Sequence, residues 1–228
     1  MPKLKITALV PMRHHSQRVP GKNYRILAGK PLYYHILEAL SRVPEIDKIA
    51  VDTDSREIIN GLKQFFPQVV VIERPEHLKA DAIPMNEVLM YDVSQVPGDL
   101  YLQTHSTNPL LTSETISKAI NHLLDNYPTF DSMFSVTRLQ TRLWDELTRP
   151  INHNPAILLQ TQDLPPVYLE NSCFYLFTAE NLKNKRNRLG DRPMMFEVDR
   201  SEAYDIDEEV DFLMADLLKH YQLKQTGI

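Results

Sequence analysis

The residues best suited to chemistry in this sequence are positive charges gathered near its beginning. Between Met1 and Leu37 there is no acidic residue and there are seven cations, which are Lys3, Lys5, Arg13, Arg18, Lys22, Arg25 and Lys30. Several cations on one loop can hold a nucleoside triphosphate and stabilise the charge that develops during phosphoryl chemistry. Arg13, Arg18 and Lys22 are the candidates for this role, and an ordinary basic surface loop is the alternative.

Negative charges gather near the other end, where Glu197 to Asp211 holds eight acidic residues and one arginine. Asp205 and Asp207 lie two positions apart, so on an extended segment both point to one face. Mg²⁺ favours one or two carboxylates completed by phosphate and water, and we therefore predict a Mg²⁺ site at this pair. Asp207 could instead cap a helix that begins with Glu208 and Glu209. The two charged segments could also be unrelated solvated faces.

Other polar positions point to simpler roles. Asp52 and Asp54 share the same spacing, but Asp54 precedes a helical pattern, which favours a helix cap over a metal ligand. His14 and His15 are adjacent and have no cysteine nearby, so contact with phosphate or sugar is favoured over a transition-metal site. Cys173 lies in an apolar run, which predicts an inert buried thiol.

The apolar pattern predicts the elements that position these residues. Short apolar runs predict strands over residues 5–11, 48–51, 69–72, 99–103, 133–136 and 168–177. Helical spacing predicts helices over 32–40, 56–66, 85–93, 113–126 and 208–220. This alternation predicts an α/β fold with a doubly wound, mostly parallel sheet, whose ligands bind beyond the carboxyl ends of the strands. The pattern fades from Arg138 to Val167, which predicts an excursion from the sheet.

The overall composition limits the class of protein. A chain of 228 residues that is 43% hydrophobic can form one domain with a substantial core. The net charge of -5 argues against nucleic-acid binding and favours small-molecule partners. No apolar run approaches the length of a membrane span, so we predict a cytoplasmic protein without membrane attachment.

Five motifs follow one another along the chain. They are Ala8 to Arg13 with Ser16, Pro20, Lys22-Asn23 and Gly29 to Leu32; Val51 to Asp54; Glu73 to Pro75 with Leu78 and Asp81; Leu102-Gln103 with Pro109-Leu110; and Asp205 to Glu209. Taken in this order, they resemble the motifs of the acylneuraminate (CMP-sialic acid) cytidylyltransferases, which have ketodeoxyoctulosonate cytidylyltransferases as relatives. The resemblance covers roughly residues 5 to 212.

The resemblance implies a Rossmann-like, mixed but mostly parallel sheet of the nucleotide-diphospho-sugar transferase type. It implies one nucleotidyltransferase domain over 1–228, a homodimer, and a protruding dimerisation element at 138–167. The implied reaction moves CMP from CTP to the anomeric hydroxyl of an acidic 2-keto-3-deoxy sugar and releases pyrophosphate. By position, Lys22, Arg13 and Asp207 are the implied catalytic residues. The implied nucleotide-binding residues are Arg13, Ser16, Arg18, Lys22, Asn23, Arg74, Ala80 and Asp81; those for the acceptor are Gln103, Glu170 and Asn171; those for Mg²⁺ are Asp205 and Asp207.

Departures from the family pattern occur in both halves of the site, and the nucleotide half is better preserved than the acceptor half. Gln17 stands where many relatives carry lysine, and Asn171-Ser172 stands where they carry Asn-Gly. An N-acylneuraminate, a related nonulosonic acid and ketodeoxyoctulosonate all remain open as acceptor, with Arg138, Arg142 or Arg192 as a partner for its carboxylate. Another sugar nucleotidyltransferase and a catalytically silent nucleotide-binding scaffold are the alternative functions.

Overall fold

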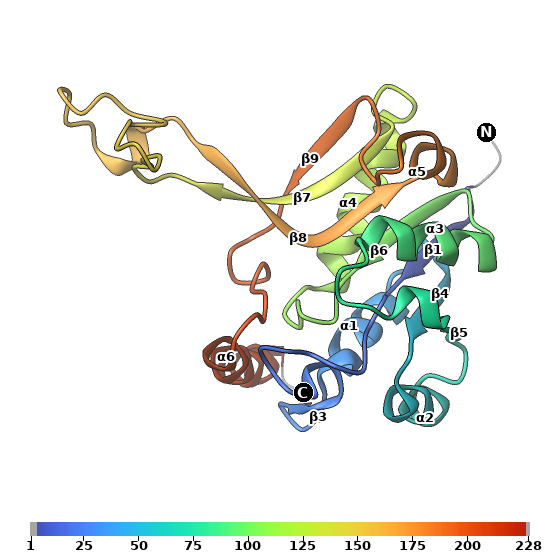
Figure 1. Cartoon of the computed structure of the whole chain (residues 1–228). Helices are drawn as coiled ribbons and strands as arrows, with labels where there is room; N and C mark the ends of the chain where they lie inside the picture. Colours follow the sequence, from blue (N-terminus) through green and yellow to red (C-terminus); the bar gives the residue numbers. More distant parts are fainter. Residues whose placement is uncertain (1–3, 227–228) are drawn as a thin grey trace.

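A computed structural model describes residues 4–226 and contains a seven-stranded mixed sheet in the order β5-β4-β1-β6-β8-β7-β9 (Figure 1). Four of the strand pairings are parallel, β1 with β4, β1 with β6, β4 with β5 and β7 with β9, whereas β8 is antiparallel to both β6 and β7. The predicted mixed, mostly parallel α/β sheet is therefore confirmed. The strands are β1 (Ile6–Leu9), β4 (Ile46–Thr53), β5 (Val70–Glu73), β6 (Leu100–Thr104), β7 (Ser132–Leu139), β8 (Val167–Phe177) and β9 (Pro193–Glu197).

Helices cover both faces of this sheet. Apolar side chains of α1 (Leu32–Ser41), α2 (Arg56–Phe65) and α4 (Ser113–Asn126) join one buried cluster with the sheet. Those of α3 (Met85–Gln95) and α5 (Ala179–Lys185) join a second cluster on the opposite face. Three of these helices have a hydroxyl side chain as their N-cap, which accepts a hydrogen bond from a free backbone amide of the first turn. These residues are Ser55 for α2, Thr112 for α4 and Thr178 for α5.

The last helix, α6 (Glu209–Thr226), packs against the first loop of the chain. That loop contains the 3₁₀ helix η1 (Lys22–Tyr24) and a small hairpin of β2 (Ile26–Leu27) and β3 (Lys30–Pro31). Phe212 and Ala215 of α6, with Ile206 before it, form a separate buried cluster with residues of the loop region, which are Val19, Leu27 and Leu32. This cluster places the basic and the acidic segments of the sequence side by side.

The chain order makes one end of the sheet a natural binding site. From β1 the chain moves outward through β4 to β5 and then returns to place β6 on the other side of β1. Loops that leave the carboxyl ends of β1 and β6 therefore diverge, and a crevice at such a switch point is where doubly wound proteins bind ligands.

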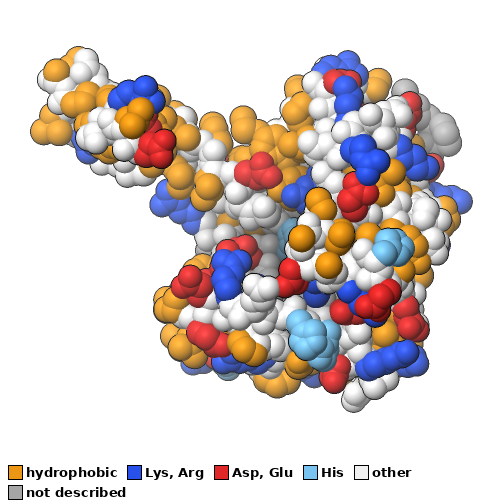
Figure 2. Space-filling view, viewed as in Figure 1, with side chains coloured by type: hydrophobic (Ala, Val, Ile, Leu, Met, Phe, Trp, Pro, Cys, Tyr) orange, Lys and Arg blue, Asp and Glu red, His pale blue; other side chains and the backbone are white. Residues whose placement is uncertain are grey.

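Strands β7 and β8 extend beyond the sheet and carry residues 140–166 as a protruding arm, seen as a separate lobe in Figures 1 and 2. This arm includes the short 3₁₀ helix η3 (Thr161–Asp163). Leu158 on the arm is 90% exposed, and the other exposed large apolar residues there are Trp144, Leu147, Ile151, Ile157 and Leu159. So much exposed apolar surface is unusual for a protein region without a partner.

Most predicted elements occur within a few residues of their expected ends, and α4 begins and ends as predicted. The elements that sequence patterns missed are α5, β9, the β2-β3 hairpin and the short 3₁₀ helices, including η2 (Glu76–Leu78). Cys173 is fully buried in β8, so the prediction of a buried thiol is confirmed, and burial raises the pKa of this thiol to about 12. Within residues 4–226, no helix combines the length and apolarity needed to cross a membrane.

Candidate active site

A pocket of about 410 Å³ opens at the carboxyl ends of the central strands. The loop after β1 forms much of its wall, Arg74 enters from the end of β5, and His105 to Thr107 close it from the end of β6. Of the residues predicted to bind nucleotide, those that line it are Arg13, Ser16, Arg18, Lys22, Asn23, Arg74 and Asp81. Ala80 is exposed in the turn next to Asp81.

The loop after β1 takes a fixed shape because of Gly21 and Asn23. Gly21 has a left-handed backbone (φ 67°) that turns the chain into η1, and a Cβ there would lie 2.9 Å from the ring of Tyr24. The buried Asn23 amide donates to the carbonyl of Arg13 over 2.7 Å, and its Oδ1 accepts from Ser106 Oγ, also over 2.7 Å. Asn23 therefore braces the wall of the pocket through both ends of its side chain.

Two cationic groups on this loop already face carboxylates. Arg13 Nη1 and the Gln17 amide both donate to Asp81, and Arg18 Nη2 lies 2.5 Å from Asp207 Oδ1. The Arg13 side chain is 41% exposed and that of Asp81 is 52% exposed, so this pair is worth little in water, about 0–1 kcal/mol. A polyanionic ligand can replace these carboxylates at little cost.

Lys22 joins the basic segment to the acidic one. Its Nζ donates to the carbonyl of Ile206 over 2.7 Å. Burial lowers the pKa of Lys22, whereas the nearby carboxylates of Asp205 and Asp207 raise it. The two charged segments thus face each other across Lys22 and Arg18, so they are not unrelated solvated faces.

The Asp205-Ile206-Asp207 segment lies at the edge of the pocket. Burial raises the pKa of Asp205, and a hydrogen bond from Thr107 opposes that shift, although the carboxylate still reaches solvent. The free amides of Asp207 and Glu208 donate to Asp211 Oδ2 over 3.0 and 2.8 Å. Asp211 therefore caps the start of α6, and the alternative that Asp207 is the cap is wrong.

The donors present fit a Mg²⁺ ion shared with a ligand. Among residues 4–226 there is no cluster of three or more His, Cys, Asp or Glu residues able to enclose a metal. Asp205 and Asp207 offer hard oxygen atoms beside a pocket lined by the cations Arg13, Arg18 and Lys22. Mg²⁺ commonly takes one or two carboxylates and leaves its other positions to phosphate and water, which is the arrangement that this pair permits.

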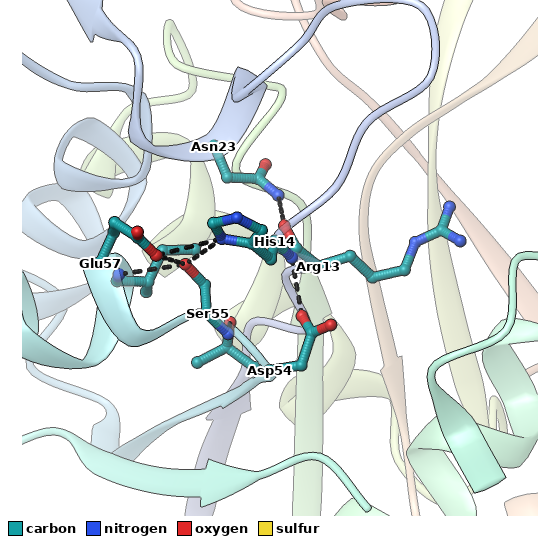
Figure 3. Close-up of polar contacts among 8 residues, drawn as sticks. Arg13, His14, Asn23, Asp54, Ser55 and Glu57 are labelled. Carbon is teal, nitrogen blue, oxygen red and sulfur yellow. Dashed lines mark hydrogen bonds and ion pairs between the residues drawn. The ribbon is translucent and has the colours of Figure 1, made fainter. Parts of the chain in front are cut away.

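His14 and Asp54 make contacts other than those predicted from the sequence. The His14 ring lies 2.9 Å from Ser55 Oγ and 3.2 Å from Glu57 Oε2, and it points away from the Arg13 side chain (Figure 3). Only His15 of the two histidines is among the residues that line the pocket. Asp54 accepts the backbone amide of His14 over 2.7 Å, so the prediction that Asp54 caps a helix is wrong; Ser55 is the cap.

A second pocket of about 330 Å³ lies next to the first, on the side of β7 and β8. Its lining residues are Thr137, Leu169, Glu170, Asn171, Ser172, Arg200, Ala203 and Asp205. It thus contains both Glu170 and Asn171, and its Asp205 carboxylate acts on Lys22, which lines the first pocket. Arg200 is its one cationic lining residue.

The arginines expected for an acceptor carboxylate lie elsewhere. Arg142 donates to the carbonyl of Leu159 within the arm, and Arg192 donates to the carbonyl of Pro128 over 2.9 Å. Arg138 is exposed on β7, where its carbonyl accepts from Arg200. None of the three lines the second pocket.

Gln103 is fully buried behind the first pocket and orients His105. Arg188 Nη1 donates to Gln103 Oε1 over 2.6 Å, which leaves the Gln103 amide facing His105 Nε2 at 2.9 Å. Because the NH₂ group of the Gln103 amide can only donate, His105 Nε2 must accept the hydrogen bond. The His105 ring is therefore neutral, with its proton on Nδ1. Burial lowers the pKa of His105 to about 4, in agreement with this neutral form.

Glu170 and Asn171 are held by neighbours on β7 and β8. The Tyr175 hydroxyl donates to Glu170 Oε1, and the guanidinium of Arg188 lies 3.4 Å from the centre of the Tyr175 ring. Asn171 donates to Thr137 Oγ1 over 2.9 Å, and its Oδ1 accepts the amide of Cys173. Ser172 adopts a left-handed backbone (φ 56°), a conformation that glycine adopts more freely than other residues.

Three residues near the pockets carried no clear sequence signal. His105 follows β6 directly, so its position after a central strand was the one available hint. Arg188 and Arg200 lie after α5 and β9, two elements that the sequence patterns did not predict. Their approach to the site therefore could not be foreseen.

Comparisons with known proteins identify relatives of this chain. The model of the family described as Cytidylyltransferase matches residues 7–226. N-acylneuraminate cytidylyltransferase of Oncorhynchus mykiss is 27% identical over 221 residues, which cover 94% of this chain and 50% of that protein. CMP-N,N'-diacetyllegionaminic acid synthase of Legionella pneumophila subsp. pneumophila is 28% identical over 231 residues, which cover 94% of this chain and 96% of that protein. The chain thus spans about half the length of the fish relative and nearly all of the bacterial one.

The fold has a close counterpart among solved structures. CMP:2-keto-3-deoxy-manno-octonic acid synthetase complexed with CTP superposes with a TM-score of 0.74 and covers 96% of this chain and 100% of that one. Their sequence identity is 16%, so this likeness concerns the fold alone. Because the family model extends over residues 7–226, this chain belongs to the cytidylyltransferase family of nucleotidyltransferases.

Proposed function

We propose that this protein transfers CMP from CTP to the anomeric hydroxyl of an acidic 2-keto-3-deoxy sugar, a nonulosonic acid, and releases pyrophosphate. The observation that carries the proposal is the position of Lys22 and Asp205 where two adjoining pockets meet. One pocket is lined by cations suited to a triphosphate, and the other by polar groups suited to a sugar. The names of the fish and Legionella relatives, which specify N-acylneuraminate and diacetyllegionaminic acid, support the substrate class.

In this proposal the triphosphate of CTP lies along the loop after β1. Arg13 and Arg18 exchange their contacts with Asp81 and Asp207 for phosphate oxygens, which are stronger partners because they carry more charge. Asn23 holds the loop in place for this contact, and Ser16 and Arg74 complete the lining. Ala80 and Asp81 then lie near the nucleoside.

The chemistry requires attack of the acceptor hydroxyl on the α-phosphorus and departure of pyrophosphate in line with it. Lys22 lies where charge builds up on the phosphate oxygens, and its ammonium stabilises that charge, together with Arg13. Fixed cations and well-placed reactants suffice, so no covalent intermediate with the protein is needed.

We also propose that Asp205 and Asp207 hold Mg²⁺ when CTP binds. The bound ion would neutralise charge on the phosphate oxygens. To hold it, Asp207 must release Arg18, which becomes free to bind phosphate at the same time. The carboxylates of this chain thus switch partner as the nucleotide enters.

The acceptor carboxylate pairs with Arg200 in this proposal, since Arg200 is the cation that lines the second pocket. Glu170 and Asn171 form hydrogen bonds with sugar hydroxyls. Gln103 does not contact the sugar itself but orients His105. Dimerisation through the apolar arm at 138–167 is also part of the proposal, and sedimentation of the purified protein over a range of concentrations tests it. Cytoplasmic location stays a prediction.

The decisive test is pyrophosphate release with CTP, Mg²⁺ and a panel of N-acylneuraminate, diacetyllegionaminate and ketodeoxyoctulosonate. We expect turnover with a nine-carbon acid and with CTP in preference to UTP, GTP and ATP. If ketodeoxyoctulosonate is the only acid that supports turnover, it is the acceptor and the nonulosonic acid of the proposal is wrong. Release of no pyrophosphate with any pair, despite CTP binding, would favour the silent scaffold.

A further inference from the structure

Three charged groups are buried together beneath the nucleotide pocket. Asp52 at the end of β4 and Asp92 on α3 are each 1% exposed, and Arg74 after β5 is 6% exposed. Arg74 Nε donates to Asp52 Oδ1. Two carboxyl groups and one guanidinium cannot balance their charges if both carboxyls are ionised, and an uncompensated charge is costly in a protein interior.

The hydrogen bonding in this cluster shows how the imbalance is relieved. Neither oxygen of Asp92 has a donor partner among the described residues, and Asp52 Oδ2 has none either. The Asp52 and Asp92 carboxyl groups lie within interaction distance of each other, so they would repel if both were ionised. If Asp92 carries a proton, however, its hydroxyl donates to Asp52, which gives one Asp92 oxygen and the free Asp52 oxygen a partner and removes one of the two negative charges.

We infer that Asp92 is a positioning residue of the nucleotide site: as a neutral acid it donates a hydrogen bond to Asp52, and this bond fixes Asp52 and therefore the guanidinium of Arg74. This inference rests on the proposed function, because it assigns the fixed Arg74 to CTP. Arg74 lines the first pocket, and its Nη2 has no acceptor among the described residues. The anchored guanidinium thus keeps donor capacity that Asp52 does not use.

The pKa values of the cluster agree with a shared proton. Burial and the neighbouring Asp52 carboxylate raise the pKa of Asp92 to about 9, and Arg74 opposes the shift. The charged groups that face the cluster are Arg74 from the end of β5 and Asp54 from the end of β4. Above pH 9 Asp92 ionises as well, and its carboxylate competes with Asp52 for the guanidinium of Arg74. Arg74 then loses its fixed position.

The sign of the effect on stability follows from linkage. An unfolded aspartate loses its proton near pH 4, whereas native Asp92 keeps it to about pH 9. Between these values the native state binds one more proton than the unfolded state, so Asp92 makes the wild type less stable as pH rises. Asp92→Asn keeps a donor toward Asp52 but does not titrate. The melting temperature of Asp92→Asn minus that of wild type should therefore grow from pH 5 to pH 9.

The binding test compares wild type, Asp92→Asn and Asp92→Leu, with calorimetric titration of CTP at pH 7.5 and again above pH 9. At pH 7.5 we expect Asp92→Asn to bind CTP within about twofold of wild type and Asp92→Leu to bind about tenfold more weakly, the size of one lost orienting hydrogen bond. Above pH 9 wild type should lose affinity relative to Asp92→Asn.

Two results would overturn the inference. One is a folded Asp92→Leu variant that binds CTP as tightly as wild type does. The other is a melting-temperature difference between Asp92→Asn and wild type that does not change with pH. If wild type itself fails to bind CTP, the proposed function is what fails, and the melting series still decides whether the proton is shared.

Discussion

Arg18 and Asp207, 189 positions apart in the sequence, form an ion pair with Nη2 2.5 Å from Oδ1. The pair joins the loop after β1 to the segment before α6, and Lys22 makes a second link through the carbonyl of Ile206. In the proposed mechanism, nucleotide binds Arg18 and Mg²⁺ binds Asp207, so the two ligands would separate this ion pair.

Lys22→Ala should lower kcat by about 100- to 1,000-fold, the usual loss when a group that stabilises transition-state charge is removed. Lys30→Ala is the matched control, because Lys30 is an exposed lysine of the same loop region that lies over the rings of Tyr34 and Phe65. Pyrophosphate release with CTP and the accepted sugar acid measures both. Near-normal turnover of Lys22→Ala would remove the catalytic role given to Lys22.

Asp207→Ala should abolish the activity that depends on Mg²⁺ or raise the Mg²⁺ concentration that it requires. Asp211→Ala is the comparison, since Asp211 caps α6 and is not a proposed metal ligand. We expect Asp211→Ala to cost about 1 kcal/mol of stability with an unchanged Mg²⁺ requirement. A Mg²⁺ titration of activity and a thermal melt separate the two roles, and the same Mg²⁺ requirement in all three proteins contradicts the metal assignment.

Arg200→Ala should raise KM for the sugar acid by about 10- to 100-fold and leave KM for CTP unchanged, because one charge-assisted hydrogen bond to a carboxylate is lost. Arg192→Ala serves as its control, since Arg192 bonds to the carbonyl of Pro128 away from the second pocket. Initial rates at varied concentrations of each substrate provide the measurement. An equal rise in both KM values would point to a general distortion instead.

Gly21→Ala should destabilise the protein more than Gly29→Ala. Both glycines have positive φ, 67° and 80°, so alanine strains the backbone at either position. Only at Gly21 does the new Cβ meet a side chain, the Tyr24 ring at 2.9 Å, while at Gly29 nothing lies within 4 Å. Thermal melts should therefore show a larger loss for Gly21→Ala, accompanied by weaker CTP binding as the loop shifts. An equal decrease in melting temperature for the two variants would mean that the Tyr24 ring can move aside without destabilising the protein.

The sequence was informative where a local pattern decides the structure. Apolar runs and helix spacing predict most strands and helices because each is set by which residues can face a core. Helix caps were less predictable: Ser55 caps α2 in place of Asp54, and Asp211 caps α6 in place of Asp207. The exact turn of the chain decides which of several nearby acceptors meets the free amides, and that turn depends on distant packing.

The site could be predicted only where its residues follow central strands. The cations after β1 were recognisable because a loop at the end of a buried strand is a natural ligand site. Asp92 gave no such signal, since one aspartate within a helix normally faces water. Arg188 and Arg200 reach the site from elements near the edge of the sheet, and their approach depends on the antiparallel pairing of β8 with β6 and β7.

Cys173 offers a practical opportunity. It is the one cysteine of the chain, and its thiol is buried and almost entirely protonated at neutral pH. Electrophilic reagents that react with thiolates should therefore leave the native protein unlabelled. A cysteine introduced at an exposed position such as Leu158 would then be the sole reactive group. The native sequence is thus already suited to site-specific attachment of spin labels or fluorophores, with which the surroundings of the arm can be measured directly in solution.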